Sequence, residues 1–165
     1  MARQLWLLRH ADAEPHGTRQ DSERRLTERG ERQARLAGVA IARMGVEFEA
    51  LLSSPKERAL RTATVAAQEL SDRSQVGRQH GRLEVHPPLA GGFDAQQALA
   101  ALADRSADGR LLLVGHEPDL STVVGQLTGA RIDLKKGGLA VVRVEGPSGE
   151  LLALLRPSEL ALIAD

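Results

Sequence analysis

The sequence predicts an α/β protein built on a largely parallel sheet. Short apolar runs alternate along the chain with segments whose apolar residues recur at helical spacing, which is the pattern of repeated β-α units. One apolar run, Leu111 to His116, is uninterrupted, as expected for a central parallel strand buried on both faces. The chain has 165 residues, about the size of one domain, so we expect a single domain over residues 1–165.

The first half of the chain predicts two strands, each followed by a helix. Leu5 to Arg9 is the first strand, and "LTERGERQARLAGVAIARMG" follows as a helix with Thr27 as its N-cap. "ALLSSP", which starts at Ala50, is the second strand, and Glu57 to Leu70 is the second helix. The letters "SPKE" match an S-x-x-E capping box with Ser54 as N-cap and proline at the first helical position.

The second half begins with a polar, turn-rich stretch, "SDRSQVGRQHGR", which predicts a surface loop. Leu83 to His86 is a short third strand and Ala95 to Ala103 is a helix. The central strand ends at His116, and another helix follows it. Finally, "GLAVVRV" and "LLALLR" flank the turn "EGPSGE", so they predict a hairpin that makes the sheet mixed.

Composition excludes several classes of function. Lys plus Arg and Asp plus Glu are both 22, so no net charge draws the protein to nucleic acid or to a membrane surface. Cysteine is absent, which excludes disulfides and thiolate metal ligands. The apolar segment at the start is too short for a signal peptide, and no later run approaches a membrane span. We therefore expect a soluble, cytoplasmic protein with neither nucleic acid nor membrane as partner.

Unusual residues stand where three of the predicted strands end. Arg9 and His10 end the first strand, Arg58 lies in the first helical turn after the second, and His116 ends the central strand. Parallel sheets bind ligands at the carboxyl ends of their strands, where helix N-termini also present free N–H groups. Guanidinium groups match the oxygens of a phosphate. The sequence therefore predicts a phosphate pocket at this edge.

Four ordered motifs carry a resemblance to a known family. "LLRHADAE", "LTERG", "SSPKERALRTA" and "LLLVGHEPDLS" together resemble the histidine phosphatase superfamily, and the small SixA-type phosphohistidine phosphatases most closely. The resemblance spans nearly the whole chain and implies a three-layer α/β/α sandwich of the phosphoglycerate mutase type. It also implies that His10 is the nucleophile that becomes phosphorylated, and that Arg9, Arg58 and His116 hold the phosphoryl group.

The chemistry accounts for these residue types. A neutral imidazole attacks phosphorus through one ring nitrogen when a fixed acceptor holds the proton on the other. Flanking arginines disfavour the protonated imidazole and neutralise charge on the phosphoryl oxygens in the transition state. Water then hydrolyses the phosphohistidine, so we expect no metal and no cofactor.

The sequence departs from the family at two places. The common R-H-G reads R-H-A here, so Ala11 stands where glycine would allow positive φ. Mutases and phosphomonoesterases of the superfamily also carry a glutamate after the third strand, as the acid for the leaving alkoxide. That region reads "PPLAGGFDAQ" in this chain, and three carboxylic acids remain as candidates: Asp94, Asp12 and Glu117.

Several other charged residues have simpler interpretations. Three histidines lie in polar or turn-rich settings and are expected at the surface: His16, His80 and His86. One cluster has a spacing unlike that of helical metal ligands such as H-E-x-x-H, so no metal site is expected there: His10, Asp12, Glu14 and His16. A third group is expected either at the rim of the pocket or in a solvated loop: Asp21, Arg24 and Arg25.

The sequence thus predicts a metal-independent phosphatase that acts through phospho-His10, with phosphohistidine on a protein as substrate. Two alternatives stay open: a phosphatase of small phosphate monoesters, and a phospho-ligand-binding domain without turnover. A mutase is disfavoured because the chain has no long insertion to close over a sugar phosphate. The presence of all four core residues favours catalysis over binding alone.

Overall fold

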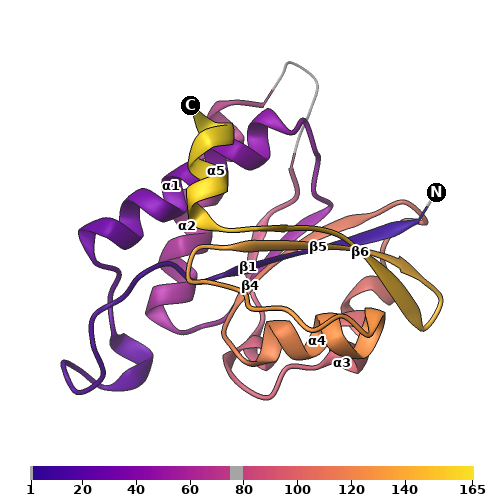
Figure 1. The fold of residues 1–165 in the computed structure, drawn as a ribbon, viewed down its shortest axis with the longest axis horizontal. Helices are drawn as coiled ribbons and strands as arrows, with labels where there is room; N and C mark the ends of the chain where they lie inside the picture. The colour runs from indigo at the N-terminus through magenta and orange to yellow at the C-terminus, as the bar shows by residue number, and fades with distance from the viewer. Residues whose placement is uncertain (1, 75–79) are drawn as a thin grey trace.

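The computed structural model describes residues 2–74 and 80–165 and contains a six-stranded sheet (Figure 1). The strands are β1 (Arg3–Arg9), β2 (Ala50–Ser53), β3 (Leu83–Val85), β4 (Arg110–Gly115), β5 (Leu139–Glu145) and β6 (Ser148–Leu155). Their order across the sheet is β3-β2-β4-β1-β5-β6. The first four of these run parallel to one another, whereas β5 and β6 form an antiparallel hairpin beside β1. The expectation of a mostly parallel, mixed sheet is confirmed.

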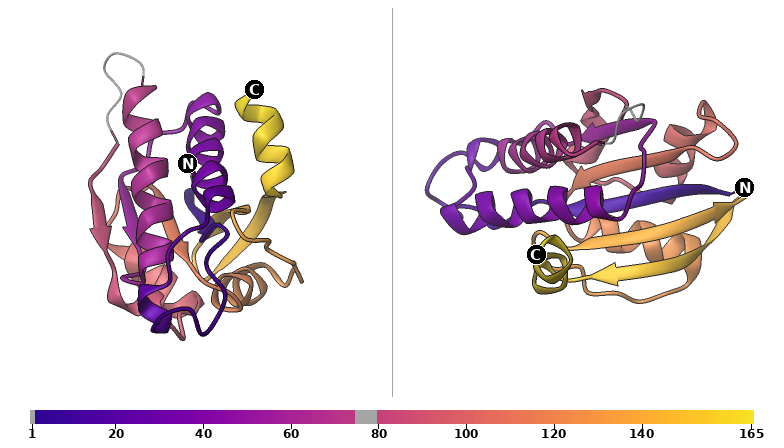
Figure 2. Two further views of the ribbon diagram at one scale, coloured as in Figure 1. Left: turned by 90° about the vertical axis from the view of Figure 1, so that its left-hand side faces the viewer. Right: turned by 90° about the horizontal axis from the view of Figure 1, so that it is seen from above.

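Helices cover both faces of the sheet, which gives the three-layer α/β/α sandwich (Figure 2). The α-helices are α1 (Glu28–Arg43), α2 (Glu57–Asp72), α3 (Ala95–Ala103), α4 (Asp119–Thr128) and α5 (Pro157–Ala164). Two short 3-10 helices are η1 (Asp21–Glu23) and η2 (Pro87–Ala90). Helices α1, α2 and α5 pack on one face of the sheet, and α3 and α4 pack on the other.

The central strands divide the core into two layers. Leu111 and Leu113 of β4 pack with α3 and α4, whereas the alternate residues Leu112 and Val114 pack with α1, α2 and α5. Strand side chains alternate between faces, so a strand that is apolar throughout must be covered on both. All four of these side chains are fully buried. The interpretation of the uninterrupted apolar run as a central strand is therefore confirmed.

The helix starts follow the sequence at α1 and differ from it at α2. Thr27 caps α1, because its hydroxyl oxygen accepts a hydrogen bond from the N–H of Gly30 at 3.1 Å. The predicted capping box at α2 is wrong: the helix begins at Glu57, its N-cap is Lys56, and no side chain caps it. The Ser54 hydroxyl instead accepts the Lys56 N–H at 3.2 Å and contacts His116, so it is not available to the third helical residue.

The chain after β6 forms a helix that the sequence analysis did not predict. Helix α5 is eight residues long and buries Leu160 and Ala164 against α1 and the sheet. The predicted surface loop after α2 begins later than expected, because Ser71 and Asp72 still belong to that helix. Residues 75–79 of that loop lie outside the described part of the chain. Within the described residues, no helix is long and apolar enough to span a membrane.

Glycine lets α1 and α2 approach each other closely, and this contact is open to test. A Cβ added to Gly38 of α1 would lie 2.8 Å from both the Cα and the carbonyl oxygen of Ala66 in α2. We expect Gly38→Ala to lower the free energy of unfolding by about 1–3 kcal/mol, because backbone must move to admit the methyl group. Urea unfolding measures the change.

Gly125→Ala in α4 is the matched control, since the nearest atom to its added Cβ is the carbonyl oxygen of Ala130 at 3.5 Å. That substitution should leave stability unchanged or raise it by up to about 1 kcal/mol through helix propensity. Equal effects of the two substitutions would contradict the close packing of α1 on α2.

Candidate active site

The ends of β1, β2 and β4 bring the predicted site residues together. Hydrogen bonds extend the pairing by one residue beyond the strands, from the N–H of His10 to the Gly115 carbonyl and from the N–H of Ser54 to the Val114 carbonyl, both at 3.0 Å. The rings of His10 and His116 lie with their centroids 5.2 Å apart. The topology alone therefore places both histidines at one edge of the sheet.

His10 is held as a neutral imidazole with a defined tautomer. Its Nδ1 lies 2.8 Å from the carbonyl oxygen of Ala11, and a carbonyl oxygen can only accept, so Nδ1 carries the proton. The Nε2 atom is left unprotonated, with its lone pair available. The Thr62 hydroxyl oxygen accepts the Ala11 N–H at 3.0 Å and donates to the Arg58 carbonyl oxygen at 2.7 Å, which fixes this turn.

Alanine at position 11, in place of the glycine of R-H-G, introduces no backbone strain. Among the described residues, no residue other than glycine has a positive φ, so this position does not need glycine.

Burial and positive charge both favour the neutral form of His10. His10 is only 6% exposed, and this burial is the main reason that its pKa falls to about 4. The charges of Arg58, Arg9 and Lys136 lower the pKa further, while the hydrogen bond to Ala11 opposes them. The imidazole is therefore neutral at neutral pH, and the lone pair on Nε2 is available for nucleophilic attack.

His116 presents a proton donor rather than a lone pair. Its Nε2 lies 2.8 Å from the hydroxyl oxygen of Ser54, which already accepts the Lys56 N–H. That hydroxyl has no other acceptor for its hydrogen among the described residues, so we assign the hydrogen to Nε2, which leaves the proton of the neutral ring on Nδ1. Burial lowers the pKa of His116 to about 3, and repulsion from Arg58 and from His10 in its protonated form contributes. Sequence reasoning missed the role of Ser54, which it had assigned to helix capping.

Three buried nitrogen atoms at this edge have no hydrogen-bond partner among the described residues: Arg9 Nε, Arg58 Nε and His116 Nδ1. An unsatisfied buried donor costs about 1–3 kcal/mol, so native proteins rarely tolerate several together. The other ends of the two guanidinium groups are anchored, with Arg9 Nη1 donating to the Leu134 carbonyl and Arg58 Nη1 to the Asp21 carbonyl. The arrangement is that of an anion site with three preset donors around His10.

Asp21 is the main counter-charge of the site. Its carboxylate lies 3.1 Å from Arg24, 3.2 Å from Lys56 and 3.4 Å from Arg58. Burial raises the pKa of Asp21, but hydrogen bonds from Lys56 and Arg24 and the charge of Arg58 outweigh it and hold the pKa well below its usual range. Asp21 and Arg24 therefore belong to the pocket rim, as one of the two expectations had it.

Arg25 does not join this rim: its side chain is exposed, and its N–H donates to Glu14. Lys56 was missed by the sequence analysis, although its place beside Arg58 at the start of a helix was a signal.

The three candidate acids are all engaged in hydrogen bonds. Asp94 caps α3, accepting the N–H of Gln97 at 3.0 Å. Asp12 accepts the Thr27 hydroxyl at 2.7 Å, and Glu117 accepts the N–H of Ser121 at 2.8 Å. Glu117 is close enough for its charge to act on Arg9.

The remaining histidines differ in burial. His16 is exposed, as expected, whereas His80 and His86 are half-buried rather than on the surface. His80 Nδ1 accepts the N–H of Phe48 at 3.2 Å, and the His86 ring packs edge-on against Phe93. Within the described part of the chain, no group of three or more His, Cys, Asp or Glu residues is placed to hold a metal ion.

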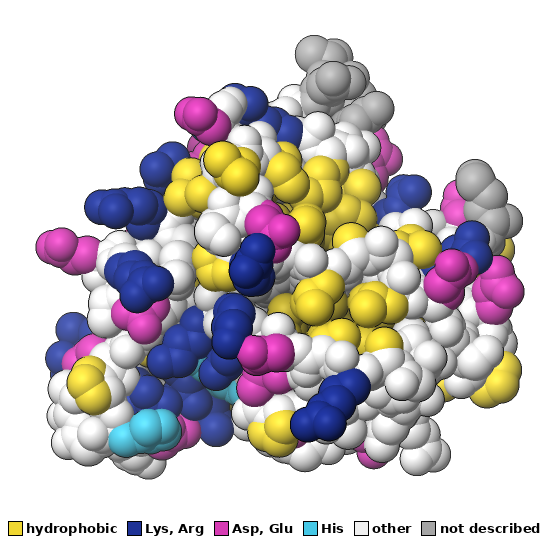
Figure 3. Space-filling model, viewed as in Figure 1, with side chains coloured by type: hydrophobic (Ala, Val, Ile, Leu, Met, Phe, Trp, Pro, Cys, Tyr) yellow, Lys and Arg dark blue, Asp and Glu magenta, His cyan; other side chains and the backbone are white. Residues whose placement is uncertain are grey.

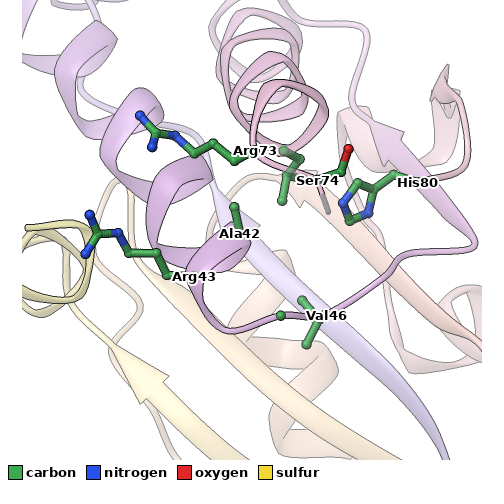
Figure 4. A pocket seen from close by; sticks show the side chains of 8 residues that line it. Ala42, Arg43, Val46, Arg73, Ser74 and His80 are labelled. Atoms are coloured by element: carbon green, nitrogen blue, oxygen red, sulfur yellow. The ribbon is translucent and has the colours of Figure 1, made fainter. Parts of the chain in front are cut away.

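A separate hollow lies at the opposite end of the helices. Ala42 and Arg43 of α1 line it together with Arg73, Ser74 and His80 (Figure 4). Ala42 and Arg43 end α1, and Arg73 and Ser74 directly follow α2, whereas the histidine pair lies near the N-terminus of α2. None of the predicted site residues lines this hollow.

Known proteins resemble this chain in sequence and in fold. The family model of the histidine phosphatase superfamily (branch 1) matches residues 5–83. An uncharacterized protein of Picosynechococcus sp. is 31% identical over 153 residues, which cover 85% of this chain and 84% of that protein. The protein histidine phosphatase SixA, solved with tungstate, superposes with a TM-score of 0.78 at 25% identity, covering 95% of this chain and 99% of that one.

A phosphoserine phosphatase of Entamoeba histolytica, solved with phosphoserine, has a TM-score of 0.69 at 18% identity. The match covers 96% of this chain and 99% of that chain, and at this identity it shows a shared fold alone.

The buried histidines make stability depend on pH. Because the pKa of His10 is about 4 in the folded chain and about 6.5 in the unfolded chain, the unfolded chain binds more protons between these values. Stability is therefore retained above about pH 6.5 and lost as the pH falls toward 4, by on the order of 3 kcal/mol for His10. Urea unfolding at a series of pH values measures this slope.

His10→Asn should flatten the slope, whereas His16→Asn should leave it unchanged, because the His16 side chain is 87% exposed. An unchanged slope in His10→Asn would show that this imidazole is not buried in its neutral form.

Proposed function

Because the chain belongs to the histidine phosphatase superfamily and has the fold of its SixA-type members, we propose that it hydrolyses phosphohistidine carried on a protein, through a covalent intermediate on His10. The observation that carries this proposal is the set of three buried donors around an unprotonated His10 Nε2 that find no partner in the described part of the chain. Such a site offers a nucleophile and an oxyanion cradle in one place.

In the first step, His10 Nε2 attacks phosphorus, and the bond from phosphorus to the substrate imidazole breaks. The Ala11 carbonyl keeps the His10 ring oriented and takes up part of the positive charge that develops on it. Arg9, Arg58 and His116 donate to the equatorial oxygens, where the charge of a loose transition state resides. The substrate imidazole carries a proton on its other ring nitrogen, so it takes the electron pair of the broken bond and leaves as a neutral ring.

In the second step, water attacks the phosphorus of phospho-His10 and the bond to Nε2 breaks. Inorganic phosphate forms, one proton of the water is released, and His10 returns to its starting state. The arginines supply the positive charge that this transfer needs, so the mechanism is metal-independent.

The leaving group decides between substrates. An alkoxide is a strong base and needs a positioned acid, whereas imidazole has a reference pKa of only about 6.5. The Asp94 carboxylate caps α3, and the carboxylates of Asp12 and Glu117 are engaged as hydrogen-bond acceptors. A site whose carboxyl groups are engaged elsewhere suits a phosphoramidate better than an alkyl phosphate.

A phosphatase of small phosphate monoesters is the second candidate. Glu117 favours it, since this carboxylate follows His116 directly and its charge acts on Arg9. To act as the acid, Glu117 would need a carboxyl oxygen free to face the leaving group, whereas one of its oxygens accepts the Ser121 N–H and the other accepts the Ser121 hydroxyl. A domain that binds phospho-ligands without turnover is the third alternative and is decided by the assays below.

We expect His10→Ala to abolish turnover and leave the fold intact, because the nucleophile is lost while the main-chain hydrogen bond from position 10 to the Gly115 carbonyl remains. Wild-type protein quenched during turnover of radiolabelled substrate should carry an acid-labile, alkali-stable phosphoryl label. His16→Ala is the matched control and should keep both activity and label. An acid-stable label, or full activity in His10→Ala, would sink the proposed mechanism.

We also expect phosphohistidine peptides to exceed alkyl phosphates in kcat/KM by at least about 10²-fold, the lower range for general acid catalysis. Asp94→Asn should change phosphohistidine hydrolysis little, because Asp94 serves as a helix cap. Comparable rates on a sugar phosphate, with a large loss in Glu117→Gln on that substrate alone, would assign the protein to the small-molecule phosphatases. Absence of turnover on every substrate, with phosphate still bound, would identify a binding domain.

A further inference from the structure

A basic groove runs alongside the candidate site, and apart from Arg9 its lining residues have no part in the chemistry above. Its volume is about 460 Å³, and it is formed where β1 ends, α1 begins, the chain enters β5, and α5 begins. Figure 3 shows basic side chains gathered around a hollow on this side of the molecule. The residues that line it are Arg9, Asp12, Arg29, Gln33, Lys135, Lys136, Arg156, Pro157 and Ser158.

We propose that this groove, here named the basic groove, binds acidic side chains that flank the phosphorylated residue of a protein substrate. The inference rests on the proposed function and narrows its substrate to phosphoproteins with Asp or Glu near the phosphohistidine. Phosphoryl transfer itself requires only the donors around His10, so a separate basic surface beside them points to recognition rather than to chemistry.

Charge in the basic groove is strongly unbalanced. Five of its lining residues are Lys or Arg, and Asp12 is its single carboxylate. The Asp12 carboxylate is already shared between the Thr27 hydroxyl and, at 3.9 Å, the ammonium group of Lys136. Arg29 makes no side-chain hydrogen bond or ion pair with any residue in the described ranges.

Two of the cations have partners just outside the lining, Lys135 with Asp133 and Arg156 with Glu159. Both pairs are well exposed, and exposed pairs contribute only about 0–1 kcal/mol. They can therefore exchange their partner for a carboxylate of a ligand at little cost.

The segment that follows Lys135 and Lys136 of the groove is tied to the nucleophile by hydrogen bonds. The N–H of Gly137 donates to the carbonyl oxygens of both Arg9 and His10, at 3.2 and 3.1 Å. Gly137 has φ +76°, and a Cβ there would lie 3.2 Å from the Cβ of Gln33, so the segment packs closely on α1. Gln33 in turn accepts the N–H of Asp12 at 2.9 Å. A groove fixed in this way loses little entropy when it binds a ligand.

The groove is within reach of a peptide whose phosphohistidine meets His10. Asp12 lies two residues after His10, a span of at most about 7 Å of extended chain. Lys136 is near enough that its charge acts on the His10 ring. Residues two to four positions from the phosphohistidine would then lie along the groove, where Arg29 and Arg156 could bind their carboxylates.

The test compares two phosphohistidine peptides, one with Asp and Glu around the phosphohistidine and one with Ser and Gly there. Arg29→Glu/Arg156→Glu should lower kcat/KM for the acidic peptide by at least about 10-fold, about 1.4 kcal/mol, mainly through KM. The same variant should change kcat/KM by less than about twofold for the Ser/Gly peptide and for p-nitrophenyl phosphate. Raised salt should weaken the preference of the wild type for the acidic peptide.

The matched control is Arg35→Glu/Arg82→Glu, which changes the net charge equally at exposed arginines outside the groove. It should leave the preference for the acidic peptide intact. Equal losses in the two double variants would mean that general charge attraction, and not the basic groove, selects the substrate. The wild type would contradict the inference equally by hydrolysing both peptides at one rate.

Binding keeps this inference separable from the proposed function. Fluorescence anisotropy of the unphosphorylated acidic peptide needs no turnover, and Arg29→Glu/Arg156→Glu should weaken that binding by at least about 10-fold. A protein that binds the peptide in this way but hydrolyses no phosphohistidine would overturn the proposed function alone. If Arg29→Glu/Arg156→Glu weakens the binding of methylene bisphosphonate but not of the peptide, the peptide inference is overturned and the groove is assigned to a small polyanion.

Discussion

The parallel pairing of β1 with β4 is the constraint on which the site depends. Residues Arg9 and Gly115 are directly opposed at the end of this pair, and the next residues along are the two histidines. Because both strands run in the same direction, their carboxyl ends open on the same edge. Strand pairing is therefore enough to bring the two histidines together. Strand β2 adds Ser54 on the other side of β4. Without the parallel register, the same residues would be scattered over the surface.

The site contains two features that each lower the stability of the fold. Three cationic or polar donors are buried without partners, and two histidines are kept neutral beside two arginines. Asp21 and the Leu134 carbonyl offset part of this cost by holding the outer ends of the guanidinium groups. The inner donors stay unsatisfied, so the fold spends some of its stability on a preset anion site. Large apolar layers on both faces of the sheet supply that stability.

The sequence predicted the layers of the fold better than the details of the site. Apolar periodicity identified α1, α2 and β4, because packing against two helix layers demands a run like "LLLVGH". The short α5 was not predicted, because eight residues show too little periodicity to distinguish a helix from an irregular segment. Ser54 was misassigned because local spacing matched a cap, while its actual partner, His116, lies 62 positions away. The contact of Asp21 with Arg58 is equally long-range, so no local pattern could choose between rim and loop.

The acceptor that orients His10 is a main-chain oxygen, and this has a consequence for how the protein can vary over evolution. No substitution can delete a carbonyl group, so the proton on Nδ1 stays in place whatever side chain occupies position 11, provided that the backbone path survives. The chain already uses this freedom by carrying alanine there. The vulnerable point moves to Thr62, whose hydroxyl is the side chain that holds the Ala11 N–H. The orientation of the His10 ring therefore tolerates a change of side chain at position 11. It depends instead on the side chain of a helix residue 52 positions away from His10.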